Sequence, residues 1–136
     1  MSREPSAVDL TKASGPSPHE GLDIYKLARS FVVDVYKDTN LFPAAERFGL
    51  VSQIRRAAVS VPVNIAEGAA RGSKQEFARF LLIARGSLSE LRVLLDIARE
   101  VGFLSELQFQ ARDKTVHRML AMANGLIRHT QRRFAR

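Results

Sequence analysis

Apolar residues recur every three or four positions along most of the chain after residue 21, a spacing typical of amphipathic helices. One such stripe runs from Leu22 to about Thr39 and consists of Ile24, Leu27, Ala28, Phe31 and Val35. A second runs from Pro43 to about Arg71, with Gly49 as a candidate interruption, and consists of Ile54, Ala58, Val61 and Ile65. These two stripes predict the first two helices.

Pro62 lies in the middle of the second predicted helix and lacks the amide hydrogen that would bond to the carbonyl of Ala58. The apolar spacing passes through Pro62 without a phase shift, which favours one kinked helix over two separate elements. Ser60 and Asn64 flank the proline and are candidates to satisfy the carbonyl that it leaves unpaired.

Two further helices are predicted in the second half of the chain. Ser73 has the pattern of an N-cap, and Glu76 three residues later completes a capping box. The third helix then ends near Gly102 and carries the longest apolar stripe: Phe77, Phe80, Leu81, Ala84, Leu88, Leu91, Leu95 and Ala98. The fourth opens near Ser105 and Gln108 and carries Val116, Met119, Leu120, Ala123, Leu126, Ile127 and Phe134.

No stretch alternates apolar and polar residues between turn signals, so no strand is predicted. Short links between helices favour antiparallel neighbours, and the pattern predicts an all-α, antiparallel, up-and-down four-helix bundle over residues 22–136, with a proline kink in helix two. Residues 1–21 are rich in proline, glycine and serine and poor in large apolar groups, which predicts a flexible leader.

The composition narrows the classes of function. The 136 residues carry a formal charge of +7 and contain no cysteine. The charge makes polyanions or acidic surfaces plausible partners, and the absence of cysteine excludes disulfide scaffolds and thiolate sites. The longest apolar runs fall far short of a membrane span, and no signal-peptide pattern is present, so a cytoplasmic protein without membrane contact is expected.

Catalytic and metal-binding patterns are missing from the sequence. His19, His117 and His129 include no pair at the spacing of metal ligands on a helix. Gly68 and Gly72 do not fit a phosphate-binding loop, and no serine stands in a nucleophile elbow. We therefore expect neither an enzyme nor a bound cofactor.

The last predicted helix carries the clearest candidate binding site. Residues 102–136 contain seven basic and two acidic groups, a surplus of five out of the total of +7. Advancing by about 100° per residue, five cations fall within one arc of about 80°, opposite the apolar arc: Lys114, Arg118, Arg128, Arg132 and Arg136. The small residues Ala121 and Gly125 lie between them, which leaves room for a phosphate backbone. A charged face that only keeps the helix soluble is an equally weighted interpretation, and no aromatic residues interleave to support sequence-specific readout.

The third helix carries a second apolar line on the face away from its main stripe. This line consists of Leu82, Gly86, Val93 and Ile97. A continuous apolar line on the back of a bundle helix favours a second packing surface, as in a homo-oligomer.

Two segments resemble a known family: SQIRRAAVSVPVNIAEG from Ser52 to Gly68, and ARGSKQEFARFLLIARGSLSEL from Ala70 to Leu91. They are similar to the four-helix-bundle proteins encoded by intervening sequences in bacterial large-subunit ribosomal RNA genes. The resemblance covers about residues 22–130, and its shared residues also include Phe42-Pro43, Glu46 and Phe48-Gly49-Leu50. Val63 departs from the small polar residue that the family often has there.

The resemblance implies a bundle that assembles as a homopentamer. A more distant relative, the accessory protein of diversity-generating retroelements, binds nucleic acid and a reverse transcriptase, so a reverse transcriptase or another neighbouring-gene product is a candidate partner. Most of the shared residues are interpreted as structural. Gly86 can let two helices approach closely, and Glu67 can pair with Arg55, Arg56 or Arg71. In the competing interpretation these three arginines line a nucleic-acid surface, since few acids stand nearby.

Together these features predict a non-enzymatic oligomer that binds RNA or DNA through basic helix faces, mainly by phosphate contacts. The alternative is a scaffold whose positive surface docks an acidic partner protein, with no nucleic acid involved.

Overall fold

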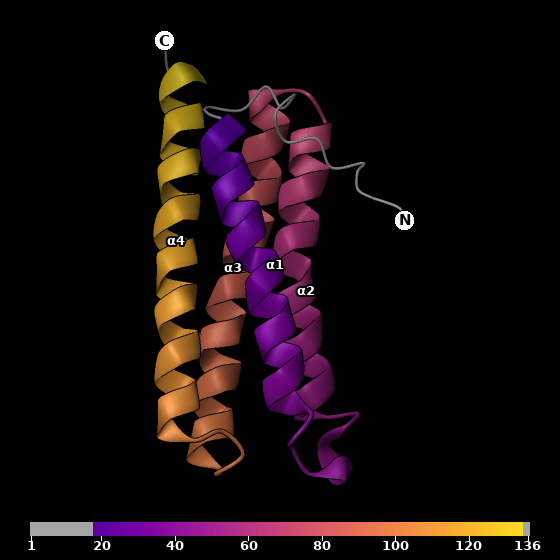
Figure 1. Ribbon diagram of the computed structural model, residues 1–136. Coiled ribbons are helices and arrows are strands. Elements are labelled where there is room, and N and C mark those ends of the chain that lie inside the picture. The colour runs from indigo at the N-terminus through magenta and orange to yellow at the C-terminus, as the bar shows by residue number, and fades with distance from the viewer. Residues whose placement is uncertain (1–17, 135–136) are drawn as a thin grey trace.

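The computed structural model describes the backbone of residues 18–134 and the side chains of residues 23–131. It contains four long helices, α1 (Pro18–Thr39), α2 (Leu50–Ala70), α3 (Lys74–Glu100) and α4 (Glu106–Phe134), and a short 3₁₀ helix, η2 (Ala44–Glu46). The chain runs down α1, up α2, down α3 and up α4, so that sequential helices lie side by side (Figure 1). Helix α1 also packs against α4, which closes the bundle. The predicted all-α, up-and-down four-helix bundle is confirmed.

Helix α1 begins four residues before the predicted start, at Pro18. Proline is favoured at the first position of a helix because the amide hydrogen that it lacks would have no partner there. Residues 1–17 of the predicted leader lie outside the described residues, and the flexibility of that segment stays a prediction.

The segment between Pro43 and Arg71 divides at Gly49, the candidate interruption. Pro43 precedes η2, and Gly49 is the N-cap residue of α2. The Glu46 carboxylate accepts a hydrogen bond from the backbone N–H of Leu50 at 3.1 Å, which satisfies one of the amides left free at the start of α2. A 3₁₀ turn and a side-chain cap therefore replace the first turns of the predicted helix.

Helix α2 continues without interruption through Pro62, so the prediction of one helix rather than two is confirmed. The hydrogen bonds around the proline differ from those expected. Asn64 Nδ2 donates to the carbonyl oxygen of Ser60 at 2.8 Å and to the Ser60 hydroxyl at 2.9 Å, rather than to the carbonyl of Ala58. The Ser60 hydroxyl in turn bonds to that of Ser87 at 2.8 Å, so these polar groups join α2 to α3.

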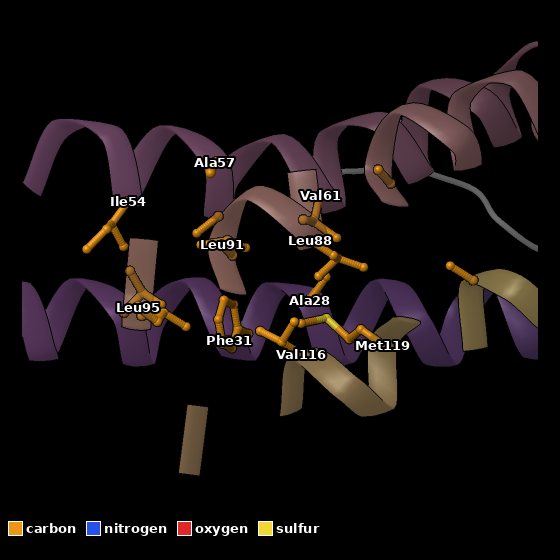
Figure 2. Packing of buried hydrophobic residues seen from close by; sticks show 14 of the residues in the cluster. Ala28, Phe31, Ile54, Ala57, Val61, Leu88, Leu91, Leu95, Val116 and Met119 are labelled. Atoms are coloured by element: carbon orange, nitrogen blue, oxygen red, sulfur yellow. The ribbon is translucent and has the colours of Figure 1, made fainter. Parts of the chain in front are cut away.

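The interior is one continuous apolar cluster with members from all four helices. It contains the described members of the predicted stripes except Leu27 and Leu120, which are half-buried against it, and Phe80, which is buried but not part of it. Phe31 of α1, Leu88 and Leu91 of α3 and Met119 of α4 meet in its middle (Figure 2). Close approach of α2 to α3 depends on Gly68, because a Cβ built there would lie 2.7 Å from the Cβ of Phe80. Such a role was predicted for Gly86, but among the described residues nothing lies within 4 Å of a Cβ built at Gly86.

A partly buried ion pair joins α1 to α4. The Arg112 Nε donates to Asp38 Oδ2 at 2.6 Å, and its Nη1 lies 3.4 Å from Asp34 Oδ2. The hydrogen bond to Asp38 raises the pKa of Arg112 above its ordinary value, and the negative charges of both aspartates act in the same direction. Arg112 is thus the one basic residue of early α4 that serves the bundle rather than its surface.

Candidate nucleic-acid interface

The outer face of α4 carries a line of exposed cations. Lys114, Arg118 and Arg128 are exposed. The buried apolar residues of the same helix over this range are Val116, Met119, Ala123, Leu126 and Ile127. Among the described side chains, none of these three cations has an ion-pair partner. The side chains of Arg132 and Arg136 lie outside the described part, and their place in the line stays a prediction. We call Lys114, Arg118 and Arg128 the α4 rim.

The small residues predicted between the cations occupy the same face. Ala121 is exposed and Gly125 half-buried, so no bulky side chain separates Arg118 from Arg128. A Cβ built at Gly125 would lie 4.0 Å from the Arg128 guanidinium. The rim is therefore a low, positively charged ridge that a phosphate backbone can approach closely.

Asp113 directly precedes Lys114 of the rim, and its carboxylate has two described contacts. Asp113 lies 4.0 Å from Arg92 of α3 and 3.4 Å from Nδ1 of His117. Among the described side chains, no acid lies within ion-pair distance of Lys114, Arg118 or Arg128.

The three arginines predicted on α2 do not form one surface. Arg71 lies about 24 Å along the helix from Arg55, at a rise of 1.5 Å per residue. Arg71 pairs with Glu67 at 3.2 Å and with Glu76 at 3.8 Å, so the expected Glu67 pairing is confirmed and the expectation that Arg71 has too few acids nearby is wrong. Glu76 is near enough because the tight turn at Gly72, with φ of +81°, brings the start of α3 back to the end of α2.

Arg55 is held by the end of α1. Its Nε donates to the Thr39 hydroxyl at 2.8 Å, and its Nη2 lies 3.4 Å from the carbonyl oxygen of Tyr36. Its guanidinium also stacks over the Tyr36 ring, 4.3 Å from the ring centre. The contact with the Tyr36 carbonyl places a cation at the C-terminus of α1, where a cation is favoured. Arg56, by contrast, is exposed.

A shallow groove between α1 and the start of α2 was not anticipated from the sequence. Its volume is about 420 Å³, and its walls are formed by Tyr36, Arg47, Phe48, Val51, Ser52, Arg55, Arg56 and Val59. The apolar periodicity could not reveal it, because Phe48 lies in the turn between η2 and α2, outside any helical stripe. Arg55 and Arg56 of its wall were predicted on a nucleic-acid surface, whereas Arg47, Tyr36 and Phe48 were not.

The outward line on α3 is exposed, as a second packing surface requires. Leu82, Val93 and Ile97 show 41%, 60% and 43% of their surface, and Gly86 lies in open space between them. The residues described here contain no group of three potential ligands placed to hold a metal ion. Over the same range, no helix combines the length and apolar character needed to cross a lipid bilayer.

The fold and this surface define a class: an all-α four-helix bundle with an exposed basic helix face. The sequence model of the 23S rRNA-intervening sequence protein family matches residues 20–125. The chain belongs to this family, as the resemblance indicated.

One solved structure supports the fold independently. It is a protein of unknown function from the S23 ribosomal protein family of Bacteroides thetaiotaomicron, with a TM-score of 0.74 at 18% sequence identity. The alignment covers 80% of this chain and 98% of that chain. Among curated proteins the search finds no match.

Proposed function

We propose that this chain is a non-enzymatic, homopentameric bundle protein that binds RNA or DNA through its basic helix faces, mainly by phosphate contacts. The observation that carries the proposal is the α4 rim. Its cations gather along one face of one helix, without counter-charges among the described side chains. Phosphate contacts of this kind supply affinity without sequence preference.

Self-association is part of the same proposal. The exposed line of Leu82, Gly86, Val93 and Ile97 offers each subunit an uncharged face for contact with a copy of itself. A few phosphate contacts per subunit give weak binding, whereas several linked copies raise the apparent affinity by orders of magnitude when all can engage one strand. Repetition of the rim around a ring of subunits therefore compensates for the few phosphate contacts that each rim can make.

Binding to labelled RNA and duplex DNA, measured across salt concentrations, tests the proposal. For duplex DNA the logarithm of affinity should fall with the logarithm of salt, with a slope of about −0.9 per phosphate contact. A variant with Lys114→Glu, Arg118→Glu and Arg128→Glu should bind more weakly and show a shallower slope. Affinity that does not weaken from low to moderate salt, or that this variant retains, would falsify the proposal.

A charge-matched variant separates the rim from net charge alone. Lys37→Glu, Lys74→Glu and Arg79→Glu change the total charge equally but at scattered positions on α1 and α3. We expect this control to lose much less affinity than the rim variant. Equal losses would show that overall charge, rather than the rim, governs binding.

The competing function is a scaffold for an acidic partner, such as a neighbouring-gene product. If nuclease-treated extracts still yield a stoichiometric acidic partner that requires the rim, and oligonucleotides do not bind, this alternative replaces the proposal.

A further inference from the structure

The groove between α1 and the start of α2 combines positive charge with exposed aromatic rings. Three of its wall residues, Arg47, Arg55 and Arg56, are arginines, and none is an acid. Phe48 shows 88% of its surface, and Tyr36 shows 42%. The α4 rim has the charge but no aromatic residue, so the groove offers a different kind of chemistry.

The aromatic rings are already arranged with the cations. The Arg47 guanidinium lies 5.9 Å from the centre of the Phe48 ring, and Arg55 stacks on Tyr36 at 4.3 Å. Arg55 is fixed by its bonds to the end of α1, so it holds Tyr36 in place at the groove wall. Arg56 is exposed at the same wall and has no ion-pair partner among the described residues, which leaves its charge available.

Positive charge continues from the groove along α1. A second hollow is lined by Lys26, Arg29, Ser30 and Val33, again without an acid. Arg29 and Tyr36 are seven residues, or two turns, apart and so lie on the same side of α1, about 10 Å from each other along the axis. A strand that enters the groove can follow this path from one cation to the next.

We propose that this groove binds single-stranded nucleic acid, with an unpaired base against Phe48 and Tyr36 and the flanking phosphates on Arg56 and Arg47. Bases within a duplex are stacked on each other and cannot reach an aromatic side chain, whereas unpaired bases stack readily on aromatic rings and arginine planes. An acidic peptide would use the arginines but would leave the exposed Phe48 ring unexplained. The proposal adds a second surface to the proposed function and does not depend on the α4 rim.

The first test compares a fluorescent single-stranded oligothymidine of about 12 nucleotides, a usual site size, with a duplex of equal length. Phe48→Ala should weaken binding of the single strand by about 5- to 150-fold, as expected for the loss of one stacked base. Duplex binding should stay unchanged. Leu41→Ala is the matched control, because Leu41 is 80% exposed at the same end of the bundle but does not line the groove.

The contribution of the Arg56 charge is tested by the same binding measurement. Arg56→Glu should weaken single-strand binding several-fold more than Lys74→Glu, which makes the same change of charge at the start of α3, beyond the far end of α2. Equal effects of the two variants would contradict the assignment of a phosphate to Arg56.

Tyr36 supplies a readout at the groove itself. The chain has two tyrosines and no tryptophan, so in a Tyr25→Phe background Tyr36 alone accounts for the emission. Stacking of a base at the groove should quench this emission when oligothymidine saturates the protein. Unchanged emission, or unchanged affinity in Phe48→Ala, overturns the groove proposal.

The outcomes for the two surfaces are distinguishable. If Phe48→Ala has no effect while the rim variant loses salt-dependent binding, only the groove proposal fails. If the rim variant binds the duplex with normal affinity while Phe48→Ala no longer binds the single strand, only the proposal for the α4 rim fails. Displacement of the oligothymidine by polyglutamate, equally in wild type and Phe48→Ala, would instead indicate an acidic polypeptide and overturn the groove assignment.

Discussion

Arg112 is a basic residue of α4 whose side chain is paired inside the bundle and not exposed on the surface. It lies on the same helix as the α4 rim, but its side chain is only 20% exposed, and its main partner, Asp38, is 9% exposed. Removing one member of such a pair leaves the other charge poorly solvated, which costs more than the pair itself contributes.

Arg112→Met should lower the free energy of unfolding by about 1–3 kcal/mol, below the range for fully buried pairs because Arg112 keeps some contact with water. Because the pKa of Arg112 is raised in the folded state, its contribution should hold at neutral and moderately alkaline pH and disappear only as the pH rises through that raised pKa. Urea denaturation measures both effects, with Arg118→Met at the exposed rim as the control. Equal stability of the two variants would contradict a structural role for Arg112.

Alanine substitutions at two glycines should change the free energy of unfolding in opposite directions. Gly68→Ala places a methyl group 2.7 Å from the Cβ of Phe80, and overpacking of this kind costs about 1–3 kcal/mol. The methyl group of Gly86→Ala meets nothing among the residues that the structure describes, and this variant should stabilise a monomer by up to about 1 kcal/mol, because alanine favours the helix. Thermal unfolding of both variants checks the order. A stable Gly68→Ala variant would show that α2 and α3 can separate without loss.

At the scale of the elements, helix starts differ in how completely they are capped. Ser105 and Gln108 form a reciprocal capping box at α4: the Ser105 hydroxyl accepts from the Gln108 amide at 3.1 Å, and the Gln108 side chain accepts from the Ser105 amide at 2.9 Å. At α3 only the first half is present, because Ser73 accepts from the Glu76 amide while the Glu76 carboxylate turns to Arg79 and Arg71. The predicted capping box at Ser73 is therefore half formed.

Ser73→Ala and Ser105→Ala should each destabilise the bundle by about 1 kcal/mol, the usual value for an N-cap. Ser89→Ala, at an exposed position in the middle of α3, should change the stability by much less. Chemical denaturation gives all three values. If Ser73→Ala and Ser105→Ala lower the stability no more than Ser89→Ala does, water satisfies the amides at the helix starts as well as the serine hydroxyls do.

At the scale of the whole molecule, the proposed surfaces are distributed over different helices. The α4 rim, the outer line of α3 and the groove between α1 and α2 lie on separate helices of a four-cornered bundle (Figure 1). The proposed self-association and the proposed nucleic-acid binding therefore use different residues.

Val93→Asp should dissociate the assembly, because it buries a charge in an apolar contact. Light scattering should give a pentamer mass for the wild type and a monomer mass for the variant. Leu107→Asp is the control, since Leu107 is 84% exposed on α4, outside the α3 line, and should leave the assembly intact. A wild-type monomer at micromolar concentration would refute the self-association.

The sequence by itself determined the helices, their order and the buried face of each, because helical periodicity is a local property that tertiary contacts here reinforce. It also placed the cations of the α4 rim on one face, since residues on one helix keep their angular spacing in any fold. Only the tertiary structure decided which charges are free. Arg71 pairs with Glu76, Arg55 bonds to the end of α1, and Tyr36 and Phe48 line the same groove. These arrangements depend on how separate elements come together in space.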